Sequence, residues 1–373
     1  MKETPWQLKI FFLTLLLTLI ACQTVMGLPD SDIEIPEASS QEDVPPPLVP
    51  SEPDAPLPNT DEQVESCLDG ESYHPDSSLC YRDDGSAEPL FIAMMDGVTE
   101  YDEDFEEDLL DDEYVLVTYE IDGNQISAPE YEAVGAGLRP YQDDAAMQQR
   151  IWQFYAAMIP RDKRSFLTHY MVITDGLGGG LAAVEQNLDN PSKGVRSIDA
   201  ADTENLQELT FTLIHEYGHL LTLNAQQVPP DDDVFYNPDD DDIYAQAEYA
   251  CSTYFTGEGC ATSSSYFYLF YDEFWADIYD DWSEIQYIED DDEYYEATDE
   301  FYFAHEDQFL TDYAATNPGE DIAESWALFI TQPKPAGNTI AEEKILFFYQ
   351  FPELVTLRGE IIARSYSRLI RMQ

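Results

Sequence analysis

The segment from residue 206 to 223 constrains this chain most, because it is long, largely apolar and free of proline. Its large apolar side chains recur at steps of three and four residues: Leu206, Leu209, Leu213, Tyr217 and Leu220. That spacing predicts a helix with one face packed in a core. Asp202 or Thr203 is expected to cap the start of this helix.

The same segment contains the sequence His215-Glu216-Tyr217-Gly218-His219, which has the pattern H-E-x-x-H. On a helix the two imidazoles lie one turn apart and point the same way, so one rigid element can hold one metal ion. Neutral imidazole is a good zinc donor, and Glu216 would lie beside the metal-bound water. The alternative is a buried helix that happens to carry two histidines, at a high cost in desolvation.

A catalytic zinc site needs a third protein ligand and an open position for water. The metzincin pattern, which extends this motif, would require Gly at position 222 and His at position 225, but the chain has Thr222 and Ala225. The only later histidine is His305, in an acidic stretch without a helical face. We expect His305 to be a solvated histidine rather than the third ligand.

The better candidate for the third ligand lies after the turn signal at residues 317–319, where an amphipathic helical pattern begins. Glu320 and Glu324 are four residues apart and share one face of this helix. We assign Glu320 to the metal and Glu324 to the free N–H of a ligand histidine, although the reverse assignment is the alternative. A solvated acidic helix start, favoured by the helix dipole, is a further alternative.

These motifs resemble those of gluzincin-type zinc metallopeptidases, and in particular bacterial zinc-binding metallopeptidase lipoproteins. The resemblance is carried by residues 215–219 together with 313–324, more weakly by 347–355, and it spans roughly residues 140–373. It implies that His215, His219 and Glu320 bind the metal, that Glu216 is the general base and that Tyr313 donates to the oxyanion. The chain departs from the family in the long acidic segment between its two ligand helices.

The first 22 residues predict a lipoprotein signal peptide. Lys2 and Lys9 flank a short apolar run, and Leu19-Ile20-Ala21-Cys22 resembles a lipobox, in which Cys22 becomes lipidated. An ordinary secretory signal or an uncleaved anchor are the alternatives. Residues 23–66 are acidic and proline-rich, which predicts a disordered tether. We therefore expect a lipid-anchored, extracytoplasmic protein of the bacterial cell envelope.

Four further cysteines occur in two local pairs, Cys67 with Cys80 and Cys251 with Cys260. An even number of cysteines with short loops predicts two disulfides in an exported protein. Zinc binding by these cysteines is the alternative, but none has C-x-x-C spacing.

The formal charge of −61 comes from 16 basic and 77 acidic side chains, and no Lys or Arg occurs between Arg196 and Lys334. This charge excludes nucleic acid as a partner. The acidic runs at 231–233, 239–242 and 289–293 are expected to be loops or a solvated face. Three explanations stay open: solubility or tolerance of a saline habitat, calcium as an additional cofactor, and attraction of a cationic substrate, although no EF-hand loop is present.

The periodicity predicts an α+β fold with a small mixed or antiparallel sheet, the H-E-x-x-H helix and a mainly helical C-terminal half. The resemblance implies that this is a zincin-like catalytic domain. We expect a helix over 145–158 and strands over 166–174, 182–187 and 194–200. Residues 67–130 would form a small acidic N-terminal region. Residues 131–373 would form the catalytic domain, with an acidic and aromatic insertion at 225–312 whose run 266–271 is expected to be a helix packed on the core.

We therefore expect a membrane-tethered, extracytoplasmic zinc metalloendopeptidase that hydrolyses peptide bonds with a metal-activated water. Its partners would be a protein or peptide substrate and the membrane, through the lipid anchor. The alternative from another class is a non-enzymatic, acidic, calcium-binding surface lipoprotein or adhesin in which the zinc site is structural or degenerate.

Overall fold

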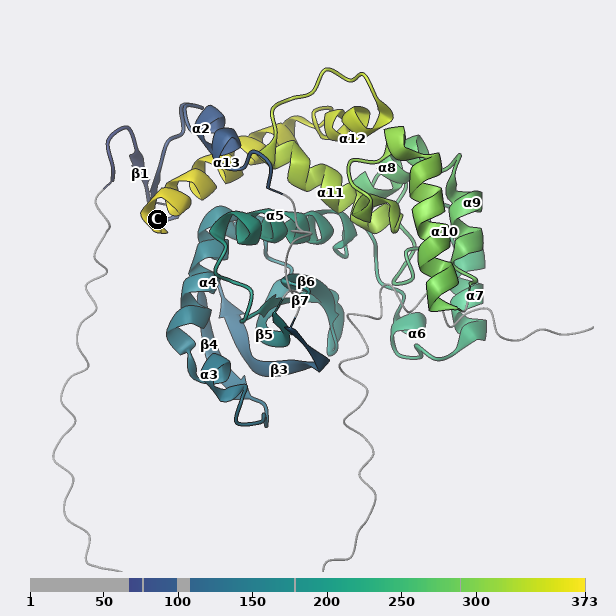
Figure 1. Ribbon diagram of the computed structural model, residues 1–373, viewed down its shortest axis with the longest axis horizontal. Coiled ribbons are helices and arrows are strands. Elements are labelled where there is room, and N and C mark those ends of the chain that lie inside the picture. The colour runs from purple at the N-terminus through teal and green to yellow at the C-terminus, as the bar shows by residue number, and fades with distance from the viewer. Residues whose placement is uncertain (1–66, 76, 99–107, 178, 289, 373) are drawn as a thin grey trace, which may run out of the picture.

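The computed structural model describes residues 67–75, 77–98, 108–177, 179–288 and 290–372 (Figure 1). The expected signal peptide, Cys22 and the tether at 23–66 lie outside these residues. Across the described part of the chain, no helix has both the length and the apolar character needed to cross a membrane.

A five-stranded sheet forms one layer of the molecule, with the strand order β4-β3-β5-β7-β6. Its strands are β3 (Asp108–Asp122), β4 (Gln125–Tyr131), β5 (Leu167–Leu177), β6 (Ala182–Asn187) and β7 (Asn190–Asp199). Only β5 and β7 pair in parallel, and the other neighbours are antiparallel. The mixed sheet confirms the α+β class. Because β3 pairs with β5, the expected N-terminal region 67–130 shares its sheet with the region after it.

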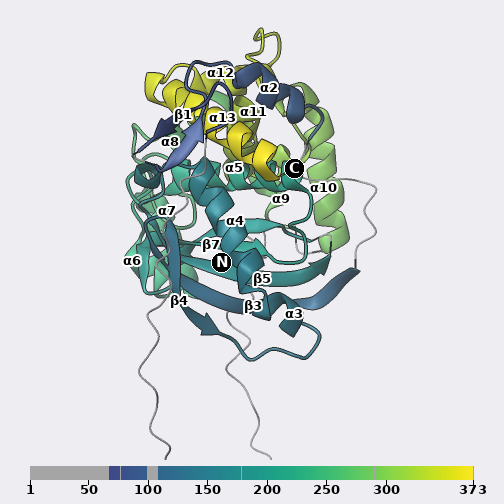
Figure 2. The same cartoon turned by 90° about the vertical axis from the view of Figure 1, so that its left-hand side faces the viewer.

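Helices cover the sheet in layers. Figures 1 and 2 show α5 (Leu206–Leu223) directly above the strands, with the C-terminal helices stacked above α5. Helix α4 (Ala145–Met158) has the predicted bounds and is capped by Asp144, whose side chain accepts from the Met147 N–H. Short helices at α3 (Arg139–Asp143) and η2 (Arg161–Lys163) flank α4 in the sequence.

Helix α5 begins later than its expected caps. The cap is Asn205, whose side chain accepts hydrogen bonds from the N–H groups of Gln207 and Glu208. The prediction of Asp202 or Thr203 was therefore wrong, because Asn205 lies directly before the first helical turn and satisfies its free N–H donors. Most of α5 is buried.

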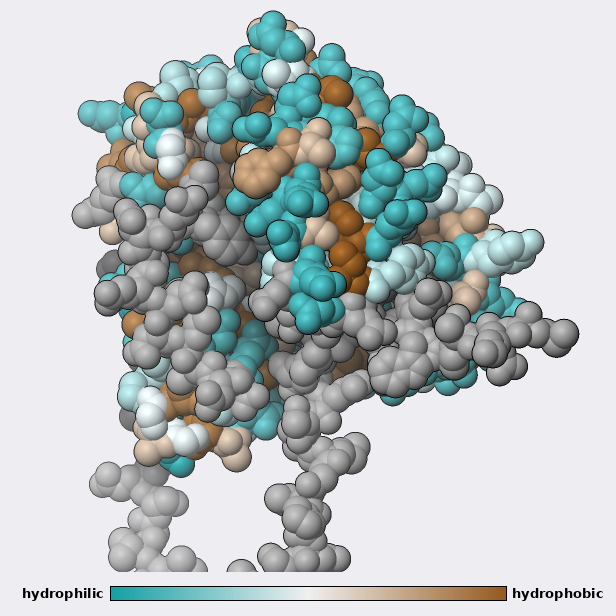
Figure 3. Space-filling model, turned by 45° about the vertical axis from the view of Figure 1, so that its right-hand side comes forward, coloured by the Kyte–Doolittle hydropathy of each residue, from teal (hydrophilic) through white to brown (hydrophobic). Residues whose placement is uncertain are grey.

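The insertion at 225–312 is mainly helical. It contains α6 (Asp232–Phe235), α7 (Asp241–Ala250), α8 (Tyr266–Phe274), α9 (Tyr279–Ile285), α10 (Asp291–Ala304) and the single turn η3 (Glu306–Gln308). Phe267, Phe270 and Phe274 of α8 are buried, so this aromatic run packs on the core as predicted. Hydrophilic residues cover much of the face drawn in Figure 3, with smaller hydrophobic patches between them.

The acidic runs of the insertion are helix starts rather than loops. Asp231, Asp240 and Asp290 cap α6, α7 and α10, and each accepts backbone N–H groups of the first turn. The expectation of a solvated face is confirmed, because the described side chains of these runs are mostly exposed. The alternative of loops was wrong, because a carboxylate at this position satisfies unpaired donors and interacts favourably with the helix dipole.

The C-terminal half consists of η4 (Tyr313–Ala315), α11 (Pro318–Thr331), α12 (Ile340–Phe348) and α13 (Pro352–Met372). Helix α13 packs on α2 (Glu88–Met94) and on the hairpin of β1 (Ser72–His74) and β2 (Leu79–Tyr81). Basic residues of α12 and α13 make ion pairs with acidic residues of other segments: Lys344 with Asp321, Arg358 with Glu88, and Arg371 with Glu71. Both predicted disulfides, Cys67–Cys80 and Cys251–Cys260, are formed.

Helices α5 and α11 approach each other closely at Gly218. A Cβ atom placed on Gly218 would lie 3.1 Å from the Ala323 Cα atom and 3.1 Å from Cδ1 of Trp326. Ala323 and Trp326 are fully buried, so neither can move into solvent. The glycine therefore sets the distance between the two helices.

The variant Gly218→Ala should lower the free energy of unfolding by about 1–3 kcal/mol, because overpacking outweighs the gain in helix propensity. The matched control is Gly359→Ala in α13, where an added Cβ meets nothing within 4 Å. That control should raise stability by up to about 1 kcal/mol. Urea unfolding measures both changes, and equal stabilisation by the two variants would contradict this account of the helix contact.

Candidate metal centre

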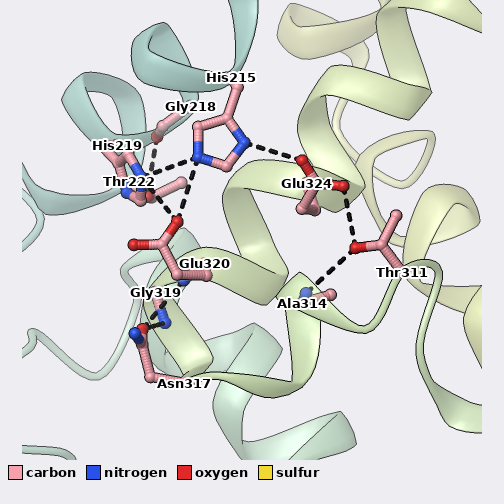
Figure 4. Close-up of polar contacts among 10 residues, drawn as sticks. All are labelled: His215, Gly218, His219, Thr222, Thr311, Ala314, Asn317, Gly319, Glu320 and Glu324. Carbon is pink, nitrogen blue, oxygen red and sulfur yellow. Dashed lines mark hydrogen bonds and ion pairs between the residues drawn. The ribbon is translucent and has the colours of Figure 1, made fainter. Parts of the chain in front are cut away.

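Three donor atoms from two helices converge on one point (Figure 4). The Nε2 atoms of His215 and His219, one turn apart on α5, are separated by 3.1 Å. One carboxylate oxygen of Glu320, on α11, lies 3.1 Å from the His215 Nε2 atom and 3.3 Å from the His219 Nε2 atom. The three predicted ligands are thus brought together across about a hundred residues of sequence, and their donor atoms all lie within 4.8 Å of one another.

The start of α11 fixes the position of Glu320. Asn317 caps this helix and accepts hydrogen bonds from the N–H groups of Gly319 and Glu320 at 2.8 Å and 3.0 Å. Pro318 occupies the first helical position, where its fixed φ suits a helix start. Glu320 therefore lies in a capped and rigid first turn.

Glu324 lies one turn further along α11 and holds the outer nitrogen of His215. One carboxylate oxygen is 3.0 Å from the His215 Nδ1 atom, and the other accepts the hydroxyl of Thr311 at 3.0 Å. Thr311 in turn accepts the Ala314 N–H, so it is fixed before η4. With a proton on Nδ1, His215 presents the lone pair of Nε2 toward His219 and Glu320.

Charge interactions at the three ligands are strong. Burial alone would raise the pKa of Glu320, but the adjacent imidazoles of His219 and His215 hold it well below its usual range. Burial alone would lower the pKa of His219, but the Glu320 carboxylate outweighs this effect and raises it. The cluster is therefore stabilised by positive charge, which a proton or a metal cation can supply. Two imidazole nitrogens and one carboxylate oxygen are a donor set that fits Zn²⁺.

Two further predicted residues lie near this cluster. Glu216 is 6% exposed, and its Oε2 atom has no hydrogen-bond partner within the described part of the chain. A buried carboxylate oxygen without a partner is costly, so it fits a group kept for chemistry rather than for stability. The Tyr313 ring lies 6.0 Å from the His215 ring, centroid to centroid, which places Tyr313 beside His215.

The remaining histidines have other neighbours. The His305 Nδ1 atom contacts the Gln308 side chain at 2.9 Å, and His305 is not one of the three converging residues. His169 on β5 contacts the side chains of Thr168 and Asn187.

A buried ion pair, which we did not predict from the sequence, lies directly behind Glu320. Asp321 and Lys344 are both fully buried, with Lys344 Nζ 2.5 Å from Asp321 Oδ2. The same oxygen accepts the indole N–H of Trp275 at 2.7 Å. These contacts join α11 to α12 and to the residue that follows α8. They connect positions 23 and 46 residues apart and have no local sequence signature.

A second group of acidic side chains could also hold a cation. Asp175, Asp199 and Asp202 each offer a carboxylate oxygen within 4.8 Å of the others. Asp199 is fully buried, and its carboxylate accepts the N–H groups of Asp175 and Ala201. Burial, together with the neighbouring Asp175 carboxylate, raises the pKa of Asp199 despite these hydrogen bonds. The calcium expected from the sequence was tied to the acidic runs of the insertion rather than to this group, and it stays a prediction.

Comparison with models of known protein families gave no match for this chain. Searches of curated proteins and of solved structures likewise gave no match.

The variant Lys344→Met should lower the free energy of unfolding by about 3–5 kcal/mol, because it leaves the buried Asp321 carboxylate without its cation. The double variant Lys344→Met, Asp321→Asn removes both charges and should recover most of this loss. Chemical denaturation of the single and double variants measures the difference. A single variant as stable as the wild type would show that the pair does not hold these helices.

The cluster of Asp175, Asp199 and Asp202 should make the folded protein less stable as the pH rises, when a chelator keeps divalent cations away from it. The folded state keeps a proton on Asp199 to higher pH than the unfolded chain, which loses it near pH 4. From about pH 4 upward the folded state thus binds more protons, so stability falls until the folded pKa is passed. Asp175→Asn removes the repelling charge and should make this fall smaller. The free energy of unfolding is measured between about pH 5 and pH 8 for the wild type and for Asp175→Asn. The same slope against pH in both proteins would contradict this account.

Proposed function

We propose that this chain is a zinc metallopeptidase that hydrolyses peptide bonds with a metal-activated water. The observation that supports this most is the convergence of His215, His219 and Glu320, with Glu324 holding His215 from behind. Three protein ligands leave a coordination position for water and substrate, as in catalytic rather than structural zinc sites. Zn²⁺ bound there would lower the pKa of water and polarise the substrate carbonyl.

Glu216, Tyr313 and Glu324 would then each have a separate role in hydrolysis. The Glu216 carboxylate accepts a proton from the attacking water as the new C–O bond forms, and it delivers that proton to the amine nitrogen as the C–N bond breaks. The Tyr313 hydroxyl donates a hydrogen bond to the oxygen of the former carbonyl, where negative charge develops. Glu324 keeps His215 in the tautomer and orientation that the ion requires.

The edge of the sheet provides a place for an extended peptide. β6 is an edge strand, and it packs against α5, which carries both histidines. A peptide that pairs with the edge of β6 that faces no other strand of the described residues would use backbone hydrogen bonds that do not depend on its sequence. This arrangement supports a peptide substrate over a small molecule.

The proposed location is the cell envelope, through a lipid on Cys22. The two disulfides support an oxidising, extracytoplasmic compartment. The lipid anchor itself rests on the sequence around Cys22 and stays a prediction.

The proposal predicts different effects of two substitutions at neighbouring positions in space. Glu216→Gln should keep one zinc ion per chain but lower peptide cleavage by about 10²–10⁴-fold, because only the proton transfer is lost. Glu320→Gln should weaken zinc binding itself, because a carboxylate ligand is lost. Metal analysis and cleavage of a diverse peptide library measure both.

The matched control is Glu130→Gln on the exposed edge strand β4, which should change neither property. Full cleavage by the Glu216→Gln variant would reject Glu216 as the base. Zinc binding without hydrolysis of any peptide would favour the alternative of a non-enzymatic surface lipoprotein.

A further inference from the structure

Arg196 of β7 is a buried cation for which the described chain provides no counter-charge. Its side chain is 1% exposed, and neither of its terminal nitrogens, Nη1 and Nη2, has a hydrogen-bond partner within the described residues. No Asp or Glu of those residues makes an ion pair with it. A buried guanidinium without a partner has a high cost in desolvation, so this position calls for a ligand that can accept its N–H groups.

Arg196 differs in this respect from the other buried basic side chains of the described chain. Each of those contacts at least one oxygen atom of the protein: Arg164, Lys344, Arg358 and Arg364. Carboxylates are abundant in this chain, with 77 acidic against 16 basic side chains. The missing counter-charge at Arg196 is therefore not explained by a shortage of acidic residues.

The Arg196 side chain lies in the layer between the sheet and the helices. Gly194 comes two residues earlier on β7, and a Cβ atom placed on it would lie 3.9 Å from the Leu220 side chain of α5. Side chains two residues apart on a strand share a face, so Arg196 also points toward the helices. There its Cζ atom lies over the Tyr155 ring of α4, 4.3 Å from the ring centroid.

The Tyr155 hydroxyl is a second donor at this place. Tyr155 is as deeply buried as Arg196, and its O–H group has no acceptor among the described residues. By contrast, Tyr170, which lies opposite Arg196 on β5, donates its hydroxyl to the Gln148 carbonyl at 3.4 Å. Arg196 and Tyr155 thus bring unmet N–H and O–H groups together in the interior, and all of these groups need an acceptor.

A small anion meets these requirements. It balances the charge of the guanidinium, and it can accept hydrogen bonds from the Arg196 nitrogens and from the Tyr155 hydroxyl at the same time. Because the place holds one cation, a monovalent anion leaves no net charge buried, whereas a divalent anion would bury a second charge at a high cost. A monatomic ion also needs the least space between closely packed layers.

We propose that Arg196 and Tyr155 form a buried binding site for a monovalent inorganic anion, with chloride as its ligand. The ion would join β7 to α4 in the layer that also contains α5. It would bind the folded chain and not the unfolded one, so chloride would stabilise the fold by mass action. This inference does not depend on the proposed peptidase activity.

The test is urea unfolding of the full chain at one constant ionic strength, with sodium gluconate replaced stepwise by sodium chloride. Constant ionic strength keeps the general screening of this acidic chain unchanged. The unfolding equilibrium constant should fall about tenfold once chloride is about ten times more concentrated than its dissociation constant, and the effect should follow a single-site binding curve. A wild-type chain that unfolds identically in gluconate and in chloride overturns the proposal.

Two variants locate the effect. Arg196→Met removes the guanidinium together with its uncompensated charge, and it should abolish the dependence of unfolding on chloride. The matched control is Arg150→Met on the exposed side of α4, which should keep the wild-type dependence. A chloride dependence that is equal in Arg196→Met and in the wild type would place the ion elsewhere and overturn the site.

Diffraction locates the ion even if Arg196→Met does not fold. Crystals of the wild-type chain are soaked in sodium bromide, and anomalous data are collected at the bromine absorption edge. A peak within hydrogen-bond distance of the Arg196 Nη atoms supports the site. Bromide found only at the surface, or water molecules as the only partners of both Nη atoms, overturns it.

Discussion

The close packing of α5 against α11 is the constraint on which the rest of this structure depends. Gly218 allows it, because any side chain at that position would meet the backbone of Ala323 and the ring of Trp326. The histidines on either side of Gly218 therefore face the first turns of α11, where Glu320 and Glu324 project. Even one carbon atom added between these helices would push them apart and move the carboxylates relative to the imidazoles. A close-packed interior transmits such a strain rather than absorbing it.

Much of the remaining structure holds α11 in place. Asn317 caps it, the buried pair of Asp321 and Lys344 ties it to α12, and the Trp275 indole ties it to the end of α8. The acidic insertion is thus not a simple surface appendage, since its Trp275 donates a hydrogen bond to Asp321 of α11. Two of the buried basic side chains contact α11: Lys344 pairs with Asp321, and Arg358 donates to the Phe329 carbonyl.

The sequence was sufficient for features that depend on local periodicity and local chemistry. The bounds of α4 followed from apolar spacing and Pro160, and the pairing of the four cysteines followed from their short loops. The convergence of Glu320 with the histidines could be predicted only because i, i+4 patterns mark both helices. The contacts of Thr311 with Glu324 and of Lys344 with Asp321 could not be predicted, because contacts between separate segments leave no local pattern. The α5 cap was missed because several polar residues precede the helix, and only the backbone geometry selects Asn205.

X-ray absorption at the zinc edge of the purified full chain tests the central claim most directly. The account predicts one zinc ion per chain with two imidazole nitrogens at about 2.0–2.1 Å and oxygen donors in the remaining positions. The imidazole signal should disappear when His215 and His219 are replaced. A chain that binds no zinc, or zinc whose spectrum shows sulfur donors or no imidazole, would contradict the account.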